Sequence, residues 1–273
     1  MKIGMGQMLV EAGDLEGNLH RAAVFAEEAQ QLGCEILVLP ECCDLGWANP
    51  DDLALAEPVP GKTSEWFRSL AMRCQLYLAA GLTEKDGDRY YNTAVLYSPQ
   101  GELLLKHRKI NVLTGIEDMY SVGDRLGVVD TPVGRIGMSI CADNLEESAV
   151  IGRVLGRMGC QLLLSPSSWA VDDAFLAEKK RYGQEWKTPY TALTDTYGMS
   201  IVGVSNVGEV TKGAWKGWHC IGNSIAIGPG GTGKELPFGV DQETLAIWDI
   251  CLQTPEKTGT SLAESAFAAE KKL

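Results

Sequence analysis

Three side chains with complementary chemistry each follow a predicted buried strand. Glu41 comes after ILVLP, Lys109 after LLLKHR and Cys141 after RIGMSI. In α/β folds, polar residues just past the carboxyl ends of strands line the ligand crevice. A thiolate there is a nucleophile, and a nearby positive charge favours its formation. Taken singly, such a Cys, Glu or Lys is most often structural, so spacing alone does not establish a site.

The three residue types together predict attack on a carbonyl carbon. The carboxylate can take the thiol proton and later deliver it to a departing nitrogen. The ammonium can stabilise the oxyanion of a tetrahedral intermediate, aided by the backbone N–H of Ala142, the residue after the cysteine. We therefore expect Glu41, Lys109 and Cys141 to meet in space, although they lie far apart in the chain.

The elements that must position these residues alternate between strands and helices. Apolar runs and alternating patterns predict strands at 2–9, 34–39, 76–82, 93–97, 103–105, 126–130, 135–140, 161–165, 201–205, 224–227 and 244–251. Helical spacing of apolar residues predicts helices at 18–32, 63–74, 145–158 and 189–198. Many strands mixed with a few helices indicate a layered α/β fold. No linker rich in Pro, Gly or Ser divides the chain, so we expect one domain over 1–273, with 254–273 as a polar C-terminal tail.

Composition excludes several classes of protein. The 273 residues are 45% hydrophobic, and no apolar run is long enough to span a bilayer. The first residues turn acidic too early for a signal peptide, so we expect a cytoplasmic location. With 24 basic and 36 acidic residues, the formal net charge of −12 disfavours nucleic acid and anionic membrane as partners. The eight cysteines are expected to be free and mostly buried thiols.

Several blocks, in order along the chain, resemble the nitrilase superfamily of carbon–nitrogen hydrolases over nearly the whole length. They are KIGMGQ, LGCEILVLPE, YNTAVLYSPQGELLLKHRKINV, VVDTPVGRIGMSICAD, GCQLLLSPSSW, VSNVG and GNSIAIGPGG. This resemblance implies a four-layer α-β-β-α sandwich, in which two stacked sheets carry helices on their outer faces. It also implies a homodimer or larger homo-oligomer, paired through a helix layer, with the tail crossing to a partner subunit as a further hypothesis.

The resemblance assigns Glu41, Lys109 and Cys141 as a catalytic triad that needs neither metal nor organic cofactor. Glu117, in EDMYSVGD, matches a second Glu that supports the Lys and orients substrate; the alternative is a surface acid in a loop. Trp169, after SPSS, either lines the substrate pocket or packs in the core.

Asp143, two residues past the cysteine, is expected to cap the following helix. Trp215, Trp218 and His219 form an aromatic loop that either shapes the pocket mouth or packs against a partner subunit.

The implied activity is hydrolysis of a small linear amide, such as an ω-amide or a carbamoyl compound, through a thioester, with release of ammonia or an amine. Ala142 and Asp143 stand where true nitrilases commonly have a Trp-Glu pair, which favours amides over nitriles. The sequence PYTALTDTYGM lacks the Arg-Ala often found at the matching helix, which leaves the substrate open. Nitrile hydrolysis, acyl transfer to an amine, and a non-catalytic binding or scaffold role remain alternatives.

Other signals carry less weight. The stretch GPGGTGK at 228–234 has phosphate-loop spacing, but Glu235 follows where Ser or Thr is needed, so we interpret it as a turn. Cys42 and Cys43 lack redox or zinc spacing and are expected to pack as spectator thiols, one of which could line the site. The three histidines show no ligand pairing, which supports neither a metal site nor a Cys–His protease.

Overall fold

The predicted strand at 34–39 explains how the layers are built. It forms β2 (Ile36–Val38), which lies parallel to β1 (Lys2–Gln7) on one side and β3 (Tyr77–Asp86) on the other. Ile36 and Val38 pack in the cluster between the two sheets, whereas Leu37 packs under the helices of the outer layer. Because both faces of the strand are covered, every position along it is apolar, as in buried parallel sheets.

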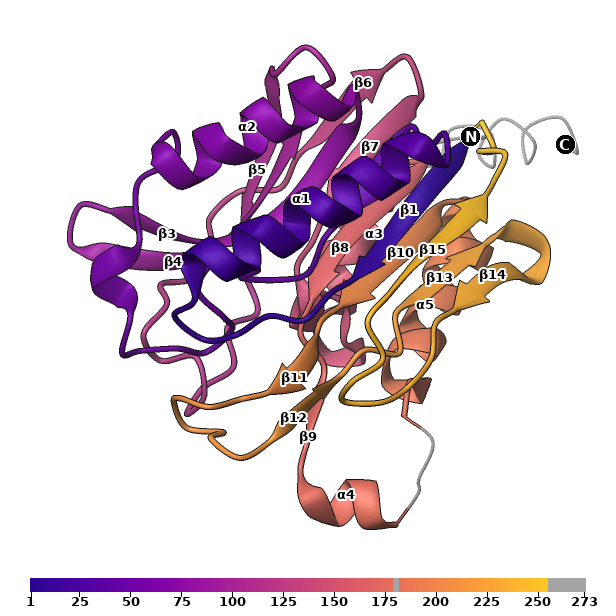
Figure 1. Ribbon diagram of the computed structural model, residues 1–273. Coiled ribbons are helices and arrows are strands. Elements are labelled where there is room, and N and C mark those ends of the chain that lie inside the picture. Colours follow the sequence, from indigo (N-terminus) through magenta and orange to yellow (C-terminus); the bar gives the residue numbers. More distant parts are fainter. Residues whose placement is uncertain (179–181, 255–273) are drawn as a thin grey trace, which may run out of the picture.

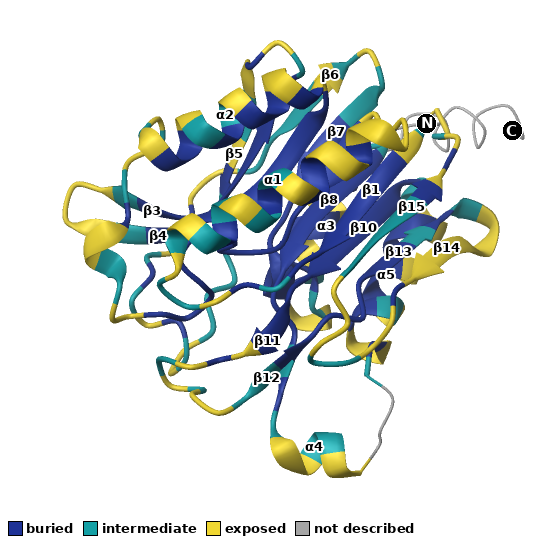
Figure 2. Ribbon diagram, in the orientation of Figure 1, coloured by how far each residue is buried: buried dark blue, intermediate teal, exposed yellow. Residues whose placement is uncertain are grey.

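The computed structural model describes residues 1–178 and 182–254, and it contains two six-stranded sheets stacked face to face (Figure 1). The first sheet has the order β15-β1-β2-β3-β4-β5, completed by β4 (Arg89–Tyr97), β5 (Leu103–Arg108) and β15 (Thr244–Asp249). Its outer face is covered by α1 (Leu15–Gln31) and α2 (Lys62–Cys74), whose solvent sides are exposed (Figure 2).

The second sheet has the order β14-β13-β10-β8-β7-β6. Its strands are β6 (Val128–Thr131), β7 (Gly134–Met138), β8 (Leu162–Ser167), β10 (Ser200–Ser205), β13 (Ile225–Gly228) and β14 (Thr232–Glu235). The outer helices here are α3 (Ala149–Arg157) and α5 (Gln184–Tyr197). The predicted four-layer sandwich is therefore confirmed.

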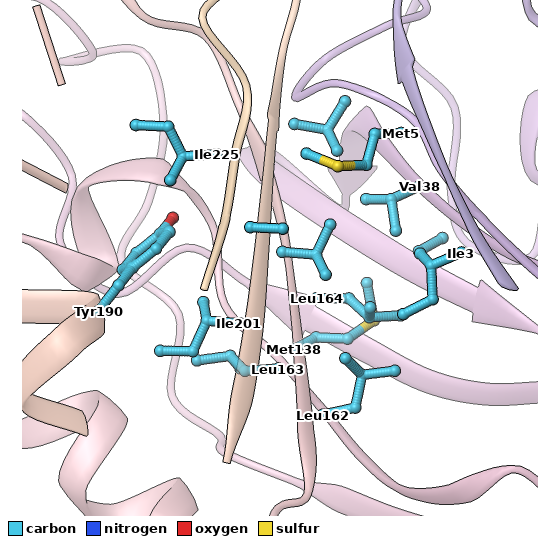
Figure 3. Close-up of a cluster of buried hydrophobic side chains, with 14 of the residues drawn as sticks. Ile3, Met5, Val38, Met138, Leu162, Leu163, Leu164, Tyr190, Ile201 and Ile225 are labelled. Carbon is cyan, nitrogen blue, oxygen red and sulfur yellow. The ribbon is translucent and has the colours of Figure 1, made fainter. Parts of the chain in front are cut away.

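Side chains alternate between the two faces of the second sheet. Leu164 of β8 lies with Met5 and Val38 of the first sheet, while Leu163 lies on the side of Tyr190 of α5 (Figure 3). Because side chains alternate along β8, this one strand contributes both to the layer between the sheets and to the layer beneath α5.

Several helix and turn boundaries differ from those predicted, beginning with the helix predicted at 145–158. Two 3-10 turns, η2 (Cys141–Asn144) and η3 (Glu146–Ser148), precede α3, so the helix starts later than expected. Helix α5 begins five residues before Pro189, because buried Trp186 anchors an extra turn ahead of it. The turn predicted at 228–234 is confirmed only over its first part, which contains η4 (Pro229–Gly231). The residues from Thr232 on belong to β14, which returns antiparallel to β13.

Short elements escaped prediction. They are η1 (Leu53–Leu55), α4 (Asp173–Ala177) and the three-stranded sheet of β9 (Ala170–Val171), β11 (Val207–Glu209) and β12 (His219–Ile221), which extends from one end of the sandwich (Figure 1). None is long enough to show a period.

Two further expectations concern cysteines and the tail. All eight cysteines are free, and only Cys251 is exposed, which confirms the expectation of buried free thiols. The tail expected at 254–273 lies outside the described residues apart from its first residue, and the single domain over 1–273 stays a prediction. Within 1–178 and 182–254, no helix is both long enough and apolar enough to cross a membrane.

We predict that Leu164→Ala destabilises the protein, because it leaves a cavity where the two sheets meet. The free energy of unfolding should fall by about 2–5 kcal/mol. Val150, 65% exposed on α3, provides the control, since Val150→Ala should change stability by less than about 0.5 kcal/mol. Denaturant titration measures both variants, and equal stability of the two would contradict this packing.

Candidate active site

Backbone contacts bring the predicted residues to one end of the sandwich. The Glu41 N–H donates to the Ser167 carbonyl at 3.2 Å, and the Ser168 hydroxyl donates to the Glu41 carbonyl at 3.4 Å. The Cys141 sulfur lies 3.9 Å from the Ser168 carbonyl oxygen. The end of β8 therefore joins the segment after β2, which carries Glu41, to the turn after β7, which carries Cys141.

Lys109 lies between two carboxylates. Its Nζ donates to Glu41 Oε1 at 2.8 Å and to Glu117 Oε1 at 2.7 Å, and all three side chains are fully buried. Burial alone would lower the pKa of the Lys109 ammonium, but the charges of Glu117 and Glu41 outweigh it and raise this pKa well above its ordinary value. Lys109 therefore stays a cation at any physiological pH.

Glu117 is buried, not a surface acid in a loop. Its Oε1 also accepts the Trp47 indole N–H at 2.6 Å, and its Oε2 accepts the Leu113 N–H at 2.8 Å. Buried carboxylates require such donors, because an unpaired charge away from water is strongly unfavourable. Trp47, Leu113 and Lys109 thus supply hydrogen-bond donors to both oxygens of Glu117.

Glu41 has one occupied oxygen and one unpaired oxygen. Oε1 accepts from Lys109 and, at 2.5 Å, from the Asn92 amide, while Oε2 has no hydrogen-bond partner among the residues described. Burial raises the pKa of Glu41 to about 7; Lys109 opposes this rise and Glu117 adds to it. A carboxyl group that titrates near neutrality can both accept and return a proton.

Cys141 sits at a strained turn. Its φ of +43° lies in the left-handed region, which costs a residue with a side chain about 1–3 kcal/mol. Burial and then the charge of Glu41 raise the pKa of the Cys141 thiol well above its ordinary value, and Lys109 does not offset them. Lys109 does lower the pKa of the thiol, as expected of a nearby cation, but burial and Glu41 outweigh it, so Cys141 keeps its proton in the resting protein.

The peptide that follows the sulfur is held rigidly. The Asn144 amide donates to the Cys141 carbonyl at 3.3 Å and to Ser165 Oγ at 2.8 Å, while its Oδ1 accepts from Ser139 Oγ at 2.9 Å. The same peptide group carries the Ala142 N–H. The orientation of that donor is consequently fixed before any substrate binds, as oxyanion stabilisation requires.

Asp143 does not cap the helix after it. Its Oδ1 accepts the N–H groups of Ile110 at 3.0 Å and Asn111 at 2.7 Å, and its Oδ2 accepts the Ile140 N–H at 3.0 Å. It also lies 2.7 Å from His107 Nε2. The carboxylate thus ties the segment after Lys109 to the turn that bears Cys141.

The pKa of Asp143 reflects these partners. Burial would raise it, but the His107 hydrogen bond and charge, with backbone N–H donors from Asn111 and Ile140, lower it below its ordinary value of 3.8. The group is therefore an anion throughout the neutral range and holds its donors continuously.

The aromatic candidates fall into two groups. Trp169 is almost fully buried and stacks on Trp186, with ring centroids 4.8 Å apart and planes at 14°; its contact with substrate stays a prediction. Trp215 instead packs edge-on against Trp47 at 5.4 Å and stacks on Trp218 at 3.8 Å.

Other predicted residues have structural neighbours. His219 Nε2 lies 2.9 Å from Asp173 Oδ1. Cys42 and Cys43 are both fully buried, with the Cys42 sulfur 3.7 Å from the Tyr120 hydroxyl, in agreement with their expected packing role. The residues that the structure covers include no cluster of three or more His, Cys, Asp or Glu side chains suited to a metal ion.

The sequence prediction missed three residues of this site. Asn92 directly precedes the strand predicted at 93–97, and an amide that such a strand buries needs a partner. Trp47 and Asn144 gave weaker signals, since each lies in a loop or turn whose contacts depend on distant segments.

Comparisons with known proteins show what the chain is similar to. The profile of the carbon-nitrogen hydrolase family matches residues 2–258. The chain is 33% identical over 162 residues to the omega-amidase NIT2-B of Xenopus laevis, and equally so to the omega-amidase NIT2 of Homo sapiens. Each alignment covers 56% of this chain and 58% of the relative. The chain therefore spans less than two thirds of the length of these relatives.

Solved structures match the fold. A carbon-nitrogen hydrolase from Helicobacter pylori G27 superposes with a TM-score of 0.79 at 24% identity, covering 90% of this chain and 87% of that one. Nit3 of Saccharomyces cerevisiae, a member of branch 10 of the nitrilase superfamily, gives 0.76 at 23% identity, covering 98% and 93%. An amidase from Nesterenkonia sp. gives 0.73 at 19% identity, covering 98% and 96%.

We predict that Asp143→Asn destabilises the protein, because an amide N–H₂ in place of Oδ2 faces the Ile140 N–H. Loss of hydrogen bonds to a charged group should lower the free energy of unfolding by about 1.5–3 kcal/mol at neutral pH. The folded-state pKa of Asp143 lies below 3.8, so the carboxylate stabilises the fold above that pH and this contribution fades as pH falls. The difference in free energy of unfolding between Asp143→Asn and the unsubstituted protein should therefore become smaller as the pH falls.

Denaturant titration across pH measures this deficit. Asp130, whose carboxylate pairs with Arg135 at 3.3 Å and is 80% exposed, provides a matched control. Asp130→Asn should change stability by less than about 0.5 kcal/mol. A deficit of Asp143→Asn that is the same at every pH would mean that the charge on the carboxylate is not what stabilises the turn.

Proposed function

Because the chain belongs to the carbon-nitrogen hydrolase family, we propose that it hydrolyses the C–N bond of a small linear amide through a thioester on Cys141. The observation that carries this proposal is the buried Lys109 ammonium, held by Glu41 and Glu117 at the end of the sandwich that also carries the Cys141 thiol. Glu41 as base, Lys109 as cation and Cys141 as nucleophile are together in this proposal, and the reaction needs no cofactor.

In the first step, the Cys141 sulfur attacks the carbonyl carbon of the amide. The thiol proton passes to Glu41, whose Oε2 has no hydrogen-bond partner in the described structure. The carbonyl π electrons move to oxygen, and the oxyanion is stabilised by the Lys109 ammonium and the Ala142 N–H. Since the thiol pKa is raised by burial, proton transfer to Glu41 accompanies the attack instead of preceding it.

In the second step, Glu41 returns the proton to the nitrogen, the C–N bond breaks, and ammonia or an amine leaves. Water then attacks the thioester carbon while Glu41 takes one of its protons, and cleavage of the C–S bond restores the thiol. A group with a pKa of about 7 suits both directions of transfer. Glu117 fixes Lys109 without taking part in bond making.

The proposed substrate class is supported by the names of the relatives. Those named omega-amidase support an ω-amide or a related carbamoyl compound as substrate. We also propose one domain for the whole chain, a homodimer or larger homo-oligomer, and a cytoplasmic location. Nitrile hydrolysis, acyl transfer and a purely binding role are alternative outcomes of the experiments below.

Ammonia release from a panel of linear amides, with a matched panel of nitriles, tests the activity. We expect turnover of amides and a loss of about a thousandfold or more in kcat/KM for Cys141→Ala. Cys251→Ala, at the exposed cysteine, should leave activity unchanged. Intact mass after brief incubation with the substrate should show an acyl group on the unsubstituted protein and none on Cys141→Ala.

Three outcomes would contradict the proposal. Turnover that survives in Cys141→Ala would remove the nucleophile, and turnover of nitriles alone would replace amide hydrolysis with nitrile hydrolysis. No turnover and no acyl adduct across both panels would favour the binding role.

The pH dependence tests the role of Glu41. The carboxyl group accepts a proton only when ionised, so kcat/KM should rise as pH increases through the Glu41 pKa of about 7. Glu41→Gln keeps the shape but cannot accept the proton, and it should lose about a hundredfold or more in kcat/KM. Glu102→Gln, at an exposed turn, serves as control. A flat profile between pH values well below and above 7 would argue against Glu41 as the base.

A further inference from the structure

We propose that Trp47 is a positioning residue for this reaction: its indole N–H fixes Glu117 and, through Glu117, the Lys109 ammonium. The inference rests on the proposed function, in which Lys109 stabilises the oxyanion. Trp47 lies in the loop after β2, six residues beyond Glu41, and is 5% exposed.

One oxygen atom links the indole to the cation. Glu117 Oε1 accepts the Trp47 N–H at 2.6 Å and the Lys109 Nζ–H at 2.7 Å, while the Asn92 amide is more distant at 3.4 Å. An indole N–H is a donor that carries no charge and does not titrate near neutrality. The indole N–H can therefore orient the Glu117 carboxylate without placing a second cation beside Lys109.

The indole itself is held by a distant segment. Trp215, in the connection between β11 and β12, packs edge-on against Trp47 at 75° and stacks on Trp218 at 17°. Lys212 of the same connection forms an ion pair with Asp52, just beyond the Trp47 loop. Aromatic packing of this kind restricts rotation of the ring and so directs its N–H.

Loss of the indole N–H has a defined electrostatic consequence. The titratable groups that Glu117 faces or acts on are Lys109, Glu41, Cys141 and Tyr120. The charge of Lys109 lowers the pKa of the Cys141 thiol, so this effect depends on where the ammonium is held. When Glu117 loses the Trp47 N–H, it holds Lys109 less firmly near the sulfur, and the pKa of the Cys141 thiol rises further.

Trp47→Phe tests the proposal, since it keeps an aromatic ring and removes the N–H. Trp66→Phe is the matched control: Trp66 lies on α2, packs against Phe67 at 5.3 Å, and is remote from the site. We expect Trp47→Phe to lower kcat about tenfold with KM within about twofold, because a hydrogen bond to a charged group contributes roughly this factor. Trp66→Phe should match the unsubstituted protein.

A second measurement does not require a substrate. The rate of Cys141 alkylation by iodoacetamide is followed against pH, with the modified peptide identified by mass spectrometry. We expect the midpoint of this profile to rise by about half a pH unit or more in Trp47→Phe. Trp215→Leu keeps the Trp47 N–H but removes the ring against which it packs. It should shift the midpoint in the same direction by less, and it tests the proposal if Trp47→Phe does not fold.

The outcomes separate this inference from the proposed function. If no amide is hydrolysed but the alkylation midpoint still rises in Trp47→Phe, the function fails and the positioning role is supported. If amides are hydrolysed and both kcat and the midpoint are unchanged in Trp47→Phe, the positioning role is overturned. A lower thermal midpoint with an unshifted alkylation profile would equally overturn it, because a purely structural tryptophan gives that result.

Discussion

The site depends on one physical constraint, the burial of a single ammonium between two carboxylates. Removing three charges from water is strongly unfavourable, and their mutual attraction compensates only when the remaining lone pairs find donors. Lys109 satisfies one oxygen of each carboxylate, and Asn92, Trp47 and the Leu113 N–H supply further contacts, while Glu41 Oε2 has no partner among the described residues. Asn92 and Trp47 come from segments distant from Lys109 in the chain, so the charge cluster and the tertiary fold require one another.

That requirement explains why irregular backbone gathers at this end of the sandwich. The parallel strands β2 and β8 deliver Glu41 and Ser168 to the same level, and the left-handed turn at Cys141 then directs its sulfur toward the Ser168 carbonyl. Asp143 fixes that turn to the segment after Lys109. The strain at Cys141 is thus sustained by hydrogen bonds on both sides of it, which is the circumstance in which such strain persists.

How much could be predicted from the sequence depends on how far apart in the chain the interacting residues lie. Glu41, Lys109 and Cys141 became candidates because each follows a predicted strand, and the resemblance to the nitrilase superfamily then singled them out. The layered fold follows from the apolar patterns of the strands and helices. Asp143 was misinterpreted because a local capping rule considers only the next helix, whereas its partners His107, Ile110 and Asn111 lie more than thirty residues away. The Trp47 contact to Glu117 spans 70 residues. Strand β14 is exposed at all four positions, so no hydrophobic pattern could reveal it.

The raised pKa of the Cys141 thiol also affects how readily peroxides oxidise this residue. Peroxides react with thiolates far faster than with thiols, and they attack most readily where the sulfur is accessible. A sulfur that is 4% exposed and holds its proton at rest is a poor target on both counts. We therefore expect sulfenic acid to form slowly at Cys141 in the unliganded state, and the exposed Cys251 to be oxidised first.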